Sequence, residues 1–218
     1  MSIQTIVFDF GNVIGFFDHG RALERLREHS ALTLEGMRAF LYGGRLEDDY
    51  ESNRITSAEF LRLVREGCRL RCSEEVLAAA YGDIFSPNPD VCDLLPRLKP
   101  RFRLLLGSNT TELHARQFRR QFADDLKHFD AQVLSCEIGT RKPGTAFFEH
   151  CQRLADCAPQ ECLFIDDLPA NVAGARACGW QGIVYAAGDD LRKQLAFHGI
   201  LTGDELTDGR RSPSSNGR

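Results

Sequence analysis

The stretch Ile3-Gln4-Thr5-Ile6-Val7-Phe8-Asp9-Phe10-Gly11-Asn12 decides the fold, because a strand-like apolar run leads directly into polar residues. Residues 3–8 are rich in Ile, Val and Phe and end before Gly11, which is typical of a buried β-strand. Three further polar motifs follow in order: Ser108-Asn109-Thr110 after the run 104–107, then Arg141-Lys142-Pro143, then Asp166-Asp167 after the run 162–165. Ligands of parallel α/β sheets bind at the carboxyl ends of the strands. The sequence therefore predicts one pocket that contains Asp9, Ser108, Lys142, Asp166 and Asp167.

Strand-like and helix-like segments alternate regularly after residue 100. The expected pairs are strand 102–107 with helix 112–122, strand 131–135 with helix 145–155, strand 162–165 with helix 169–178, and strand 182–185 with helix 189–198. Alternation of this kind predicts parallel strands with helices on both faces of the sheet. The expected fold class is α/β, with a doubly wound, Rossmann-like parallel sheet.

A long segment separates the first strand from the next convincing one at 102–106. A parallel crossover needs only a dozen or more residues, so the excess predicts an insertion. Its patterns are helical: one amphipathic segment spans 19–29, a second follows the potential cap Thr56, and a third follows Ser73. We expect an α/β core of residues 1–15 and 91–201, a helical cap of residues 16–90, and a disordered tail of residues 202–218.

Composition narrows the classes of protein to which this chain can belong. It has 218 residues, 43% of them apolar and 27% charged, which is typical of a globular domain. The formal net charge of −4 argues against a nucleic-acid partner. No apolar run approaches the roughly 20 residues of a membrane span, and the N-terminus does not resemble a signal peptide. We expect eight reduced cysteines, a cytoplasmic location, no membrane partner, and a monomer or homodimer.

Three carboxylates in one pocket call for a cation. If Asp9, Asp166 and Asp167 lie about 5 Å apart, each pair repels by roughly 3 kcal/mol at an effective dielectric near 20. The sum, roughly 10 kcal/mol, is comparable to the stability of a whole domain. Oxygen ligands favour magnesium (Mg2+) over zinc, and Asn171 is placed to orient the carboxylates. The alternative is that Asp166 and Asp167 simply cap the helix that begins near Pro169.

Ser108 and Lys142 have the chemistry of a phosphate site. A hydroxyl and the backbone N–H groups of a strand-to-helix turn bind anions, and the N-terminus of the following helix strengthens such a site. The ammonium of Lys142 can neutralise phosphoryl oxygens together with Asp9. A surface lysine is the commoner role, but Pro143 fixes the turn directly after this one. Asp9, at the end of its strand, is the candidate nucleophile, because a carboxylate can attack phosphorus to give an aspartyl-phosphate.

The order and residue types of the four motifs resemble the haloacid dehalogenase-like (HAD) hydrolase superfamily, in particular its subclass with a helical cap. The resemblance extends from Ile3 to about Leu201. Within the superfamily, Asp9, Gly11, Asn12 and Val13 match the Asp-x-Gly-Asn-Val pattern of a branch of sugar-phosphate, glucose-1-phosphatase-like, phosphatases. The Ser-Asn-Thr sequence at 108–110 resembles the same branch.

The resemblance implies a magnesium-dependent phosphatase and assigns a role to each matching residue. Asp9, Asp167 and the carbonyl of Gly11 would bind the metal directly, and Asp166 would bind it through water. Ser108, Asn109 and Lys142 would bind the phosphate. Asn12 and Asn171 would contact the residues that bind the metal, without binding the metal or the phosphate themselves. The chain departs from the family at Gly11, where most members have a second Asp that serves as the general acid. Asp18 and His19 are nearby candidates for that role, although Asp18 is more simply explained as a helix cap.

The function expected from the sequence is hydrolysis of the phosphomonoester of a small phosphorylated metabolite, with a sugar phosphate as one candidate. The polar, aromatic stretch 42–54 is expected to line the substrate pocket, unless it is an exposed helix of mixed charge. One alternative is a 2-haloacid dehalogenase that uses Asp9 without a metal. Gly11 argues against this alternative, and Arg45, as a possible carboxylate ligand, leaves it open. A second alternative is a non-catalytic HAD-like binding protein.

Overall fold

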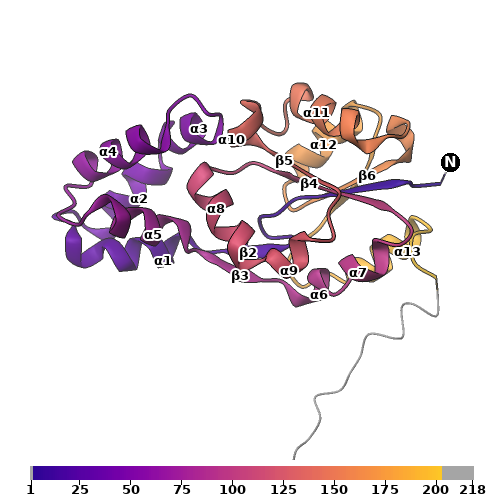
Figure 1. Ribbon diagram of the computed structural model, residues 1–218, viewed down its shortest axis with the longest axis horizontal. Helices are drawn as coiled ribbons and strands as arrows, with labels where there is room; N and C mark the ends of the chain where they lie inside the picture. The colour runs from indigo at the N-terminus through magenta and orange to yellow at the C-terminus, as the bar shows by residue number, and fades with distance from the viewer. Residues whose placement is uncertain (1, 203–218) are drawn as a thin grey trace, which may run out of the picture.

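The computed structural model describes residues 2–202, so the predicted disordered tail lies outside the described residues except for Thr202. A five-stranded parallel sheet forms one end of the molecule, and a group of helices forms the other (Figure 1). The strand order is β5 (Ala131–Leu134), β4 (Arg103–Ser108), β1 (Thr5–Phe8), β6 (Cys162–Asp166) and β7 (Gln181–Val184). The first strand of the chain is therefore the central strand of the sheet.

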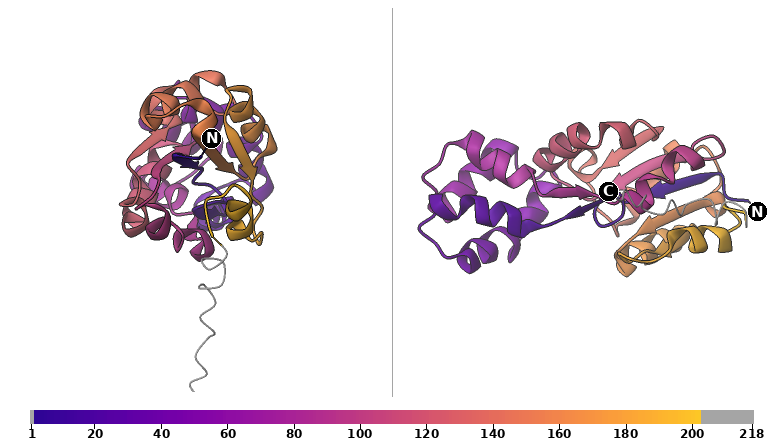
Figure 2. Two further views of the ribbon diagram at one scale, coloured as in Figure 1. Left: turned by 90° about the vertical axis from the view of Figure 1, so that its right-hand side faces the viewer. Right: turned by 90° about the horizontal axis from the view of Figure 1, so that it is seen from below.

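Helices cover both faces of the sheet, as the end-on view in Figure 2 also shows. Successive side chains of β1 point to opposite faces: Ile6 and Phe8 belong to one apolar cluster, and Val7 belongs to another. The first face packs against α6 (Pro89–Cys92), α7 (Leu95–Leu98), α8 (Glu112–Gln121), α9 (Ala123–Leu126) and α13 (Leu191–Phe197). The second face packs against α11 (Thr145–Ala155) and α12 (Pro169–Ala177). The predicted doubly wound α/β class is confirmed.

The short elements between these strands and helices are α10 (Ser135–Ile138) after β5 and the 3₁₀ turn η2 (Pro159–Glu161) before β6. Within residues 2–202, no helix is both long enough and apolar enough to span a lipid bilayer.

The segment between β1 and β4 contains a helical group with its own apolar cluster. It consists of α1 (His19–Leu26), η1 (Arg27–His29), α2 (Leu34–Tyr42), α3 (Leu46–Glu51), α4 (Ser57–Gly67) and α5 (Glu74–Gly82). The side chains of Asp18, Thr56 and Ser73 accept hydrogen bonds from the backbone N–H groups of the first turns of α1, α4 and α5. These caps explain why the helices begin where they do. We call residues 19–82 the helical insert.

A two-stranded ribbon connects the helical insert to the sheet. The outgoing strand β2 (Gly15–Phe17) pairs antiparallel with the returning strand β3 (Phe85–Pro87). The chain therefore leaves the sheet and returns to it at neighbouring points. This ribbon begins a few residues after Asp9, so it places the helical insert over the carboxyl ends of the central strands (Figure 1).

Candidate active site

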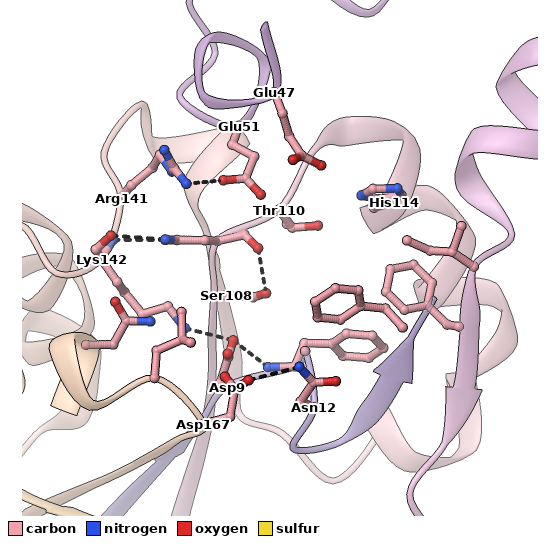
Figure 3. A pocket seen from close by; sticks show the side chains of 18 of the residues that line it. Asp9, Asn12, Glu47, Glu51, Ser108, Thr110, His114, Arg141, Lys142 and Asp167 are labelled. Carbon is pink, nitrogen blue, oxygen red and sulfur yellow. Dashed lines mark hydrogen bonds and ion pairs between the residues drawn. The ribbon is translucent and has the colours of Figure 1, made fainter. Parts of the chain in front are cut away.

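The carboxyl ends of β1, β4 and β6 bring the predicted residues together. Asp9 follows β1, Ser108 ends β4, and Asp166 and Asp167 come at the end of β6. Asp9, Ser108, Asp167 and Lys142 line one cavity of about 370 Å³ (Figure 3). Asp166 is fully buried beside it. Four of the five residues expected in one pocket therefore line the same cavity, and the fifth, Asp166, lies beside it.

Lys142 holds the site together through two buried ion pairs. Its Nζ lies 2.7 Å from Oδ1 of Asp9 and 2.7 Å from Oδ2 of Asp166, and the residue is only 4% exposed. Its ammonium also lies over the rings of Phe164 and Phe147, at 5.3 and 5.9 Å from their centroids. Burial alone would lower the pKa of Lys142, but the two carboxylates outweigh burial and raise that pKa. Lys142 is therefore a charged group in the core and not a surface lysine.

Close packing of α12 fixes the turn that carries Lys142. A Cβ atom added to Gly174 in α12 would lie 2.6 Å from the carbonyl oxygen of Pro143, so only glycine allows this approach. From the other side, the Asn109 side chain donates to the Lys142 carbonyl at 3.0 Å and accepts from the Lys142 N–H at 2.8 Å. The Asn109 amide is thus committed to positioning Lys142. Its backbone N–H is the group that it can offer to a phosphate.

Asp9 is a buried carboxylate, 7% exposed, with its hydrogen bonds concentrated on one oxygen. Oδ1 accepts from the backbone N–H of Phe10 at 2.7 Å and from Lys142. Burial raises the pKa of Asp9 to about 8; Lys142 opposes this rise, and Asp166 adds to it. The ionised form of Asp9 therefore needs more positive charge than Lys142 alone provides.

The other two carboxylates are held in place by asparagines. Asp166 accepts from the side chain of Asn171 at 3.0 and 3.1 Å and from the Leu168 N–H at 2.8 Å. Asp167, which is half-buried, accepts from the side chain of Asn12 at 2.9 Å. Asn12 adopts a left-handed backbone with φ of 55°, which asparagine tolerates better than most residues. Both asparagines predicted to support the site do contact its carboxylates.

The donor set fits a magnesium ion. Asp9, Asp166 and Asp167 each offer one carboxylate oxygen, and these three atoms lie within 4.8 Å of one another. The set contains only oxygen, which is the ligand type that Mg2+ prefers. Burial raises the pKa of Asp167 as well as that of Asp9, so a divalent cation would favour the ionised form of both.

Ser108 and the loop after it form the side of the cavity next to β5. Ser108 is 2% exposed and lines the cavity together with Thr110. The backbone N–H of Thr110 donates to the hydroxyl of Ser135 at 2.9 Å, and that hydroxyl in turn donates to the Thr110 carbonyl at 3.1 Å. Ser135, the first residue of α10, thereby fixes the loop that follows β4.

The chain at Gly11 is open to the cavity. A Cβ atom there would lie 3.1 Å from the ring of Phe17, so a larger side chain would have to displace that ring. The side chain of Asp18 accepts a hydrogen bond from the Gly20 N–H at 2.8 Å and so caps α1. A helix cap was the simpler of the two roles considered for Asp18. His19 does line the cavity, and burial lowers its pKa to about 4.

The helical insert covers the cavity with charged residues from α3. Of the stretch 42–54, Glu47 and Glu51 line the cavity, whereas Arg45 does not belong to its lining. Arg141 reaches across from the loop before Lys142 to pair with Glu51 at 2.6 Å and with Asp48. Near the ribbon, the cavity lining is largely apolar. The sequence did not predict this part of the lining, which consists of Phe10, Phe17, Ile84, Phe85 and the ring of His114. Residues 84 and 85 carry no local sequence signal of such a role, because their place follows from the pairing of β3 with β2.

Comparisons with known proteins agree on one family. Residues 3–179 match the family model described as haloacid dehalogenase-like hydrolase. The chain is 24% identical over 199 residues to a D-ribitol-5-phosphate phosphatase of Bacteroides thetaiotaomicron, covering 88% of this chain and 97% of that protein. It is 27% identical over 187 residues to a phosphatase of Mycobacterium tuberculosis, covering 82% and 85% of the two chains. A HAD family enzyme from Bacteroides thetaiotaomicron, solved with magnesium and inorganic phosphate, superposes with a TM-score of 0.75 at 25% identity, covering 88% of this chain and 99% of that one.

Proposed function

Because this chain belongs to the haloacid dehalogenase-like hydrolase family, we propose that it is a magnesium-dependent phosphatase that hydrolyses the phosphomonoester of a small metabolite. One observation carries the proposal. The buried Lys142 ammonium joins Asp9 to Asp166 at the carboxyl ends of the central strands, and Asp167 lies beside them. This arrangement offers a nucleophile, a cation for phosphoryl oxygens and a metal site in one cavity. Relatives named as phosphatases support the same chemistry.

In the proposed reaction, Asp9 is the nucleophile. Its Oδ1 is held by Lys142 and by the Phe10 N–H, so we assign the attack on phosphorus to Oδ2. A new O–P bond forms on Asp9 while the ester P–O bond breaks, and the leaving oxygen takes up a proton from water. Water then cleaves the aspartyl-phosphate and regenerates the carboxylate, which divides a difficult hydrolysis into two easier steps.

Lys142, Ser108 and the Asn109 backbone are proposed to hold the phosphoryl group. Lys142 forms an ion pair with Asp9, and its charge lies where negative charge would gather on the phosphoryl oxygens. The hydroxyl of Ser108 and the N–H of Asn109 would donate to the same oxygens. The side chain of Asn109 would act indirectly, by fixing Lys142.

The residues that would hold Mg2+ are Asp9, Asp167 and the carbonyl of Gly11, with Asp166 in contact through water. Asp166 already accepts hydrogen bonds on both oxygens, which suits a more distant role. When bound, the ion would offset the charge of the phosphate and the carboxylates. Asn12 and Asn171 would keep Asp167 and Asp166 oriented toward it.

The two alternatives from the sequence find less support in the cavity. A 2-haloacid carries a carboxylate, and the helical insert faces Asp9 with Glu47 and Glu51 rather than with a free cation. Arg45, the candidate for that cation, lies outside the lining. A non-catalytic binding protein would have no need of a nucleophile, a buried lysine and a carboxylate cluster kept together.

Hydrolysis of p-nitrophenyl phosphate tests the proposed function. We expect turnover with Mg2+, loss of turnover in EDTA, and loss in Asp9→Asn. A matched control is Asp124→Asn, which removes a surface carboxylate whose side chain is 99% exposed, and this variant should keep wild-type activity. Turnover that persists in EDTA or in Asp9→Asn would contradict the proposal. Wild-type protein that hydrolyses no phosphate ester would also contradict it, and release of halide from 2-chloropropionate would then identify a dehalogenase.

A further inference from the structure

The end of the cavity that faces Asp9 is formed by the helical insert. Glu47 and Glu51 are four residues apart on α3, so they share one face of the helix. Figure 3 shows both side chains extending from α3 toward the space above Ser108 and Asp9. A phosphate bound beside Asp9 would place its organic part at this end. The inference below rests on the proposed function, because it concerns the leaving group of that reaction.

The positively charged side chains that line the cavity already form ion pairs with carboxylates of the protein. Lys142 is shared by Asp9 and Asp166, and Arg141 is shared by Asp48 and Glu51. Within residues 2–202, these two are the only lysine or arginine side chains of the lining.

The two histidines of the lining add no positive charge near neutral pH. Burial lowers the pKa of His114 to about 3 and that of His19 to about 4, so both rings are neutral. An anionic leaving group would therefore meet no unengaged cation at this end of the cavity.

Glu47 is the polar group of this end that lacks an ionic partner within the described residues. Burial raises its pKa to about 8, and the nearby charge of Glu51 adds to the rise. In either protonation state, the carboxyl can hydrogen-bond to a hydroxyl, because a hydroxyl both donates and accepts. A carboxylate or phosphate of a ligand would instead bring a second acceptor and a second negative charge against the ionised form of Glu47, and a further negative charge against Glu51.

A buried hydroxyl, that of Tyr81, lies next to Glu47, although Tyr81 is not among the residues that line the cavity. Tyr81 is 1% exposed, and its hydroxyl makes no hydrogen bond of standard geometry within the described residues. The closeness of this hydroxyl tends to lower the pKa of Glu47. The rings of Phe17, Phe85 and His114 also line the cavity and offer an apolar surface to C–H groups. A lining that combines polar groups with aromatic rings suits a polyhydroxylated carbon chain.

From this balance of charges, we infer that Glu47 selects phosphomonoesters whose leaving group is uncharged and hydroxylated, and rejects those with a carboxylate or a second phosphate. Glu51 supports this selection while it is held by Arg141. Glu47 acts here as a specificity-determining residue at the leaving group, and Asp9 remains the site of the chemistry.

The experiment compares pairs of substrates that differ only in one terminal group. Glycerol 3-phosphate and 3-phosphoglycerate differ by CH2OH against carboxylate, and sorbitol 6-phosphate and 6-phosphogluconate differ in the same way. We expect wild-type kcat/KM to favour the neutral member of each pair by about tenfold or more. Where turnover is slow, the ratio is measured as competitive inhibition of p-nitrophenyl phosphate hydrolysis.

Charge reversal at position 47 provides the decisive comparison. We expect Glu47→Lys to lower the neutral-to-anionic ratio by about tenfold or more, and Glu47→Gln to lower it by a smaller factor. The matched control is Asp49→Lys, which makes the same charge change on α3 at a residue that pairs with Arg54 outside the lining. Asp49→Lys should keep the wild-type ratio, and circular dichroism checks that each variant is folded. If Glu47→Lys does not fold, Glu47→Gln alone tests the inference.

Two failures are distinguishable. If the wild-type protein hydrolyses p-nitrophenyl phosphate with Mg2+ but the ratios do not favour the neutral compounds, or do not change in the Glu47 variants, the inference is wrong and the proposed function stands. If no phosphomonoester is hydrolysed, the proposed function is wrong and the inference is overturned with it.

Discussion

Lys142 shows what a single residue contributes to both stability and chemistry. Two carboxylates in the core depend on its one ammonium, since Asp9 and Asp166 each lie 2.7 Å from Nζ. We expect Lys142→Met to lower the free energy of unfolding by about 3–5 kcal/mol, because one partner of a buried ionic group is removed. We expect the same variant to lower kcat/KM at least about 100-fold. Urea unfolding in EDTA measures the first effect without the contribution of a metal.

Lys127→Met is the matched control for this substitution. Lys127 pairs with Asp124 on the surface at 3.2 Å, and its side chain is 61% exposed. Its replacement should change the free energy of unfolding by no more than about 0.5 kcal/mol. Equal losses in the two variants would mean that the buried ion pairs contribute little.

At the scale of residues, the sequence could predict the chemistry of the site better than its shape. Asp9 and Asp167 were predictable because they come directly after buried strands, where parallel α/β sheets bind ligands. Lys142 follows α10 and not a strand, so only its Arg-Lys-Pro motif pointed to it. The contact from Asn12 to Asp167 and the double contact from Asn109 to Lys142 depend on loop conformations that no local pattern specifies. Glu47 and Glu51 lay inside the predicted stretch 42–54, but the sequence does not show which of its residues face the cavity.

Among the elements, α8 and α5 form a contact that depends on pH. His114 of α8 donates from Nε2 to the Tyr81 carbonyl of α5 at 3.0 Å, and its ring stacks on that of Tyr81 at 4.3 Å. Burial lowers the pKa of His114 to about 3, below the usual value of 6.5. Above pH 6.5, the ring is neutral in both the folded and the unfolded chain, and the full stability is present. As pH falls toward 3, His114 binds a proton in the unfolded chain but stays neutral in the folded chain. The free energy of unfolding therefore decreases.

We therefore expect the free energy of unfolding to fall between pH 6.5 and 4 by up to about 1.4 kcal/mol per pH unit for this histidine. Urea unfolding of wild type and His114→Phe at several pH values measures the slope. The variant should show a shallower slope, and His150→Gln on α11 should keep the wild-type slope. Equal slopes in wild type and His114→Phe would contradict the assignment to His114.

Elements with strong periodicity or clear caps were predictable, and short ones were not. The strands of the sheet are apolar runs, and α4 combines the cap Thr56 with buried Phe60, Leu61 and Val64 on one face. In contrast, α6, α7, α9 and α10 span four residues each, which is too short for a helical period to be visible. α3 is a six-residue helix, too short for a periodic pattern to decide whether its stretch lines the pocket or is an exposed helix of mixed charge.

The whole molecule contains separate apolar clusters that are joined at a few points. Leu113 of α8 packs into the cluster of the helical insert, and its N–H donates to the Tyr50 hydroxyl at 3.2 Å. Arg141 and Glu51 add an ion pair across the same boundary. We expect these contacts to make the helical insert and the sheet unfold together.

Two spectroscopic probes test this cooperativity. Trp180 is the single tryptophan of the chain and packs on one face of the sheet, so its fluorescence reports on the sheet. Far-ultraviolet circular dichroism reports on helices, many of which lie in the helical insert. Their urea midpoints should coincide in wild type, and Leu113→Ala should lower both midpoints together, while Val76→Ala at an exposed position of α5 should move neither. Loss of the helical signal before the fluorescence change would show that the insert unfolds alone.

The central position of β1 has a consequence for the nascent chain. Thr5 of β1 pairs with Arg103 on one side and with Cys162 on the other, so both partner strands leave the ribosome long after β1. The helical insert lies between β1 and β4 in the sequence, and nearly all of its apolar cluster has been synthesised before either partner of β1 exists. During translation, β1 remains an apolar strand with two unpaired edges, the kind of segment that molecular chaperones protect from aggregation. The central strand of the finished sheet is thus synthesised first, and both strands that pair with it are synthesised much later.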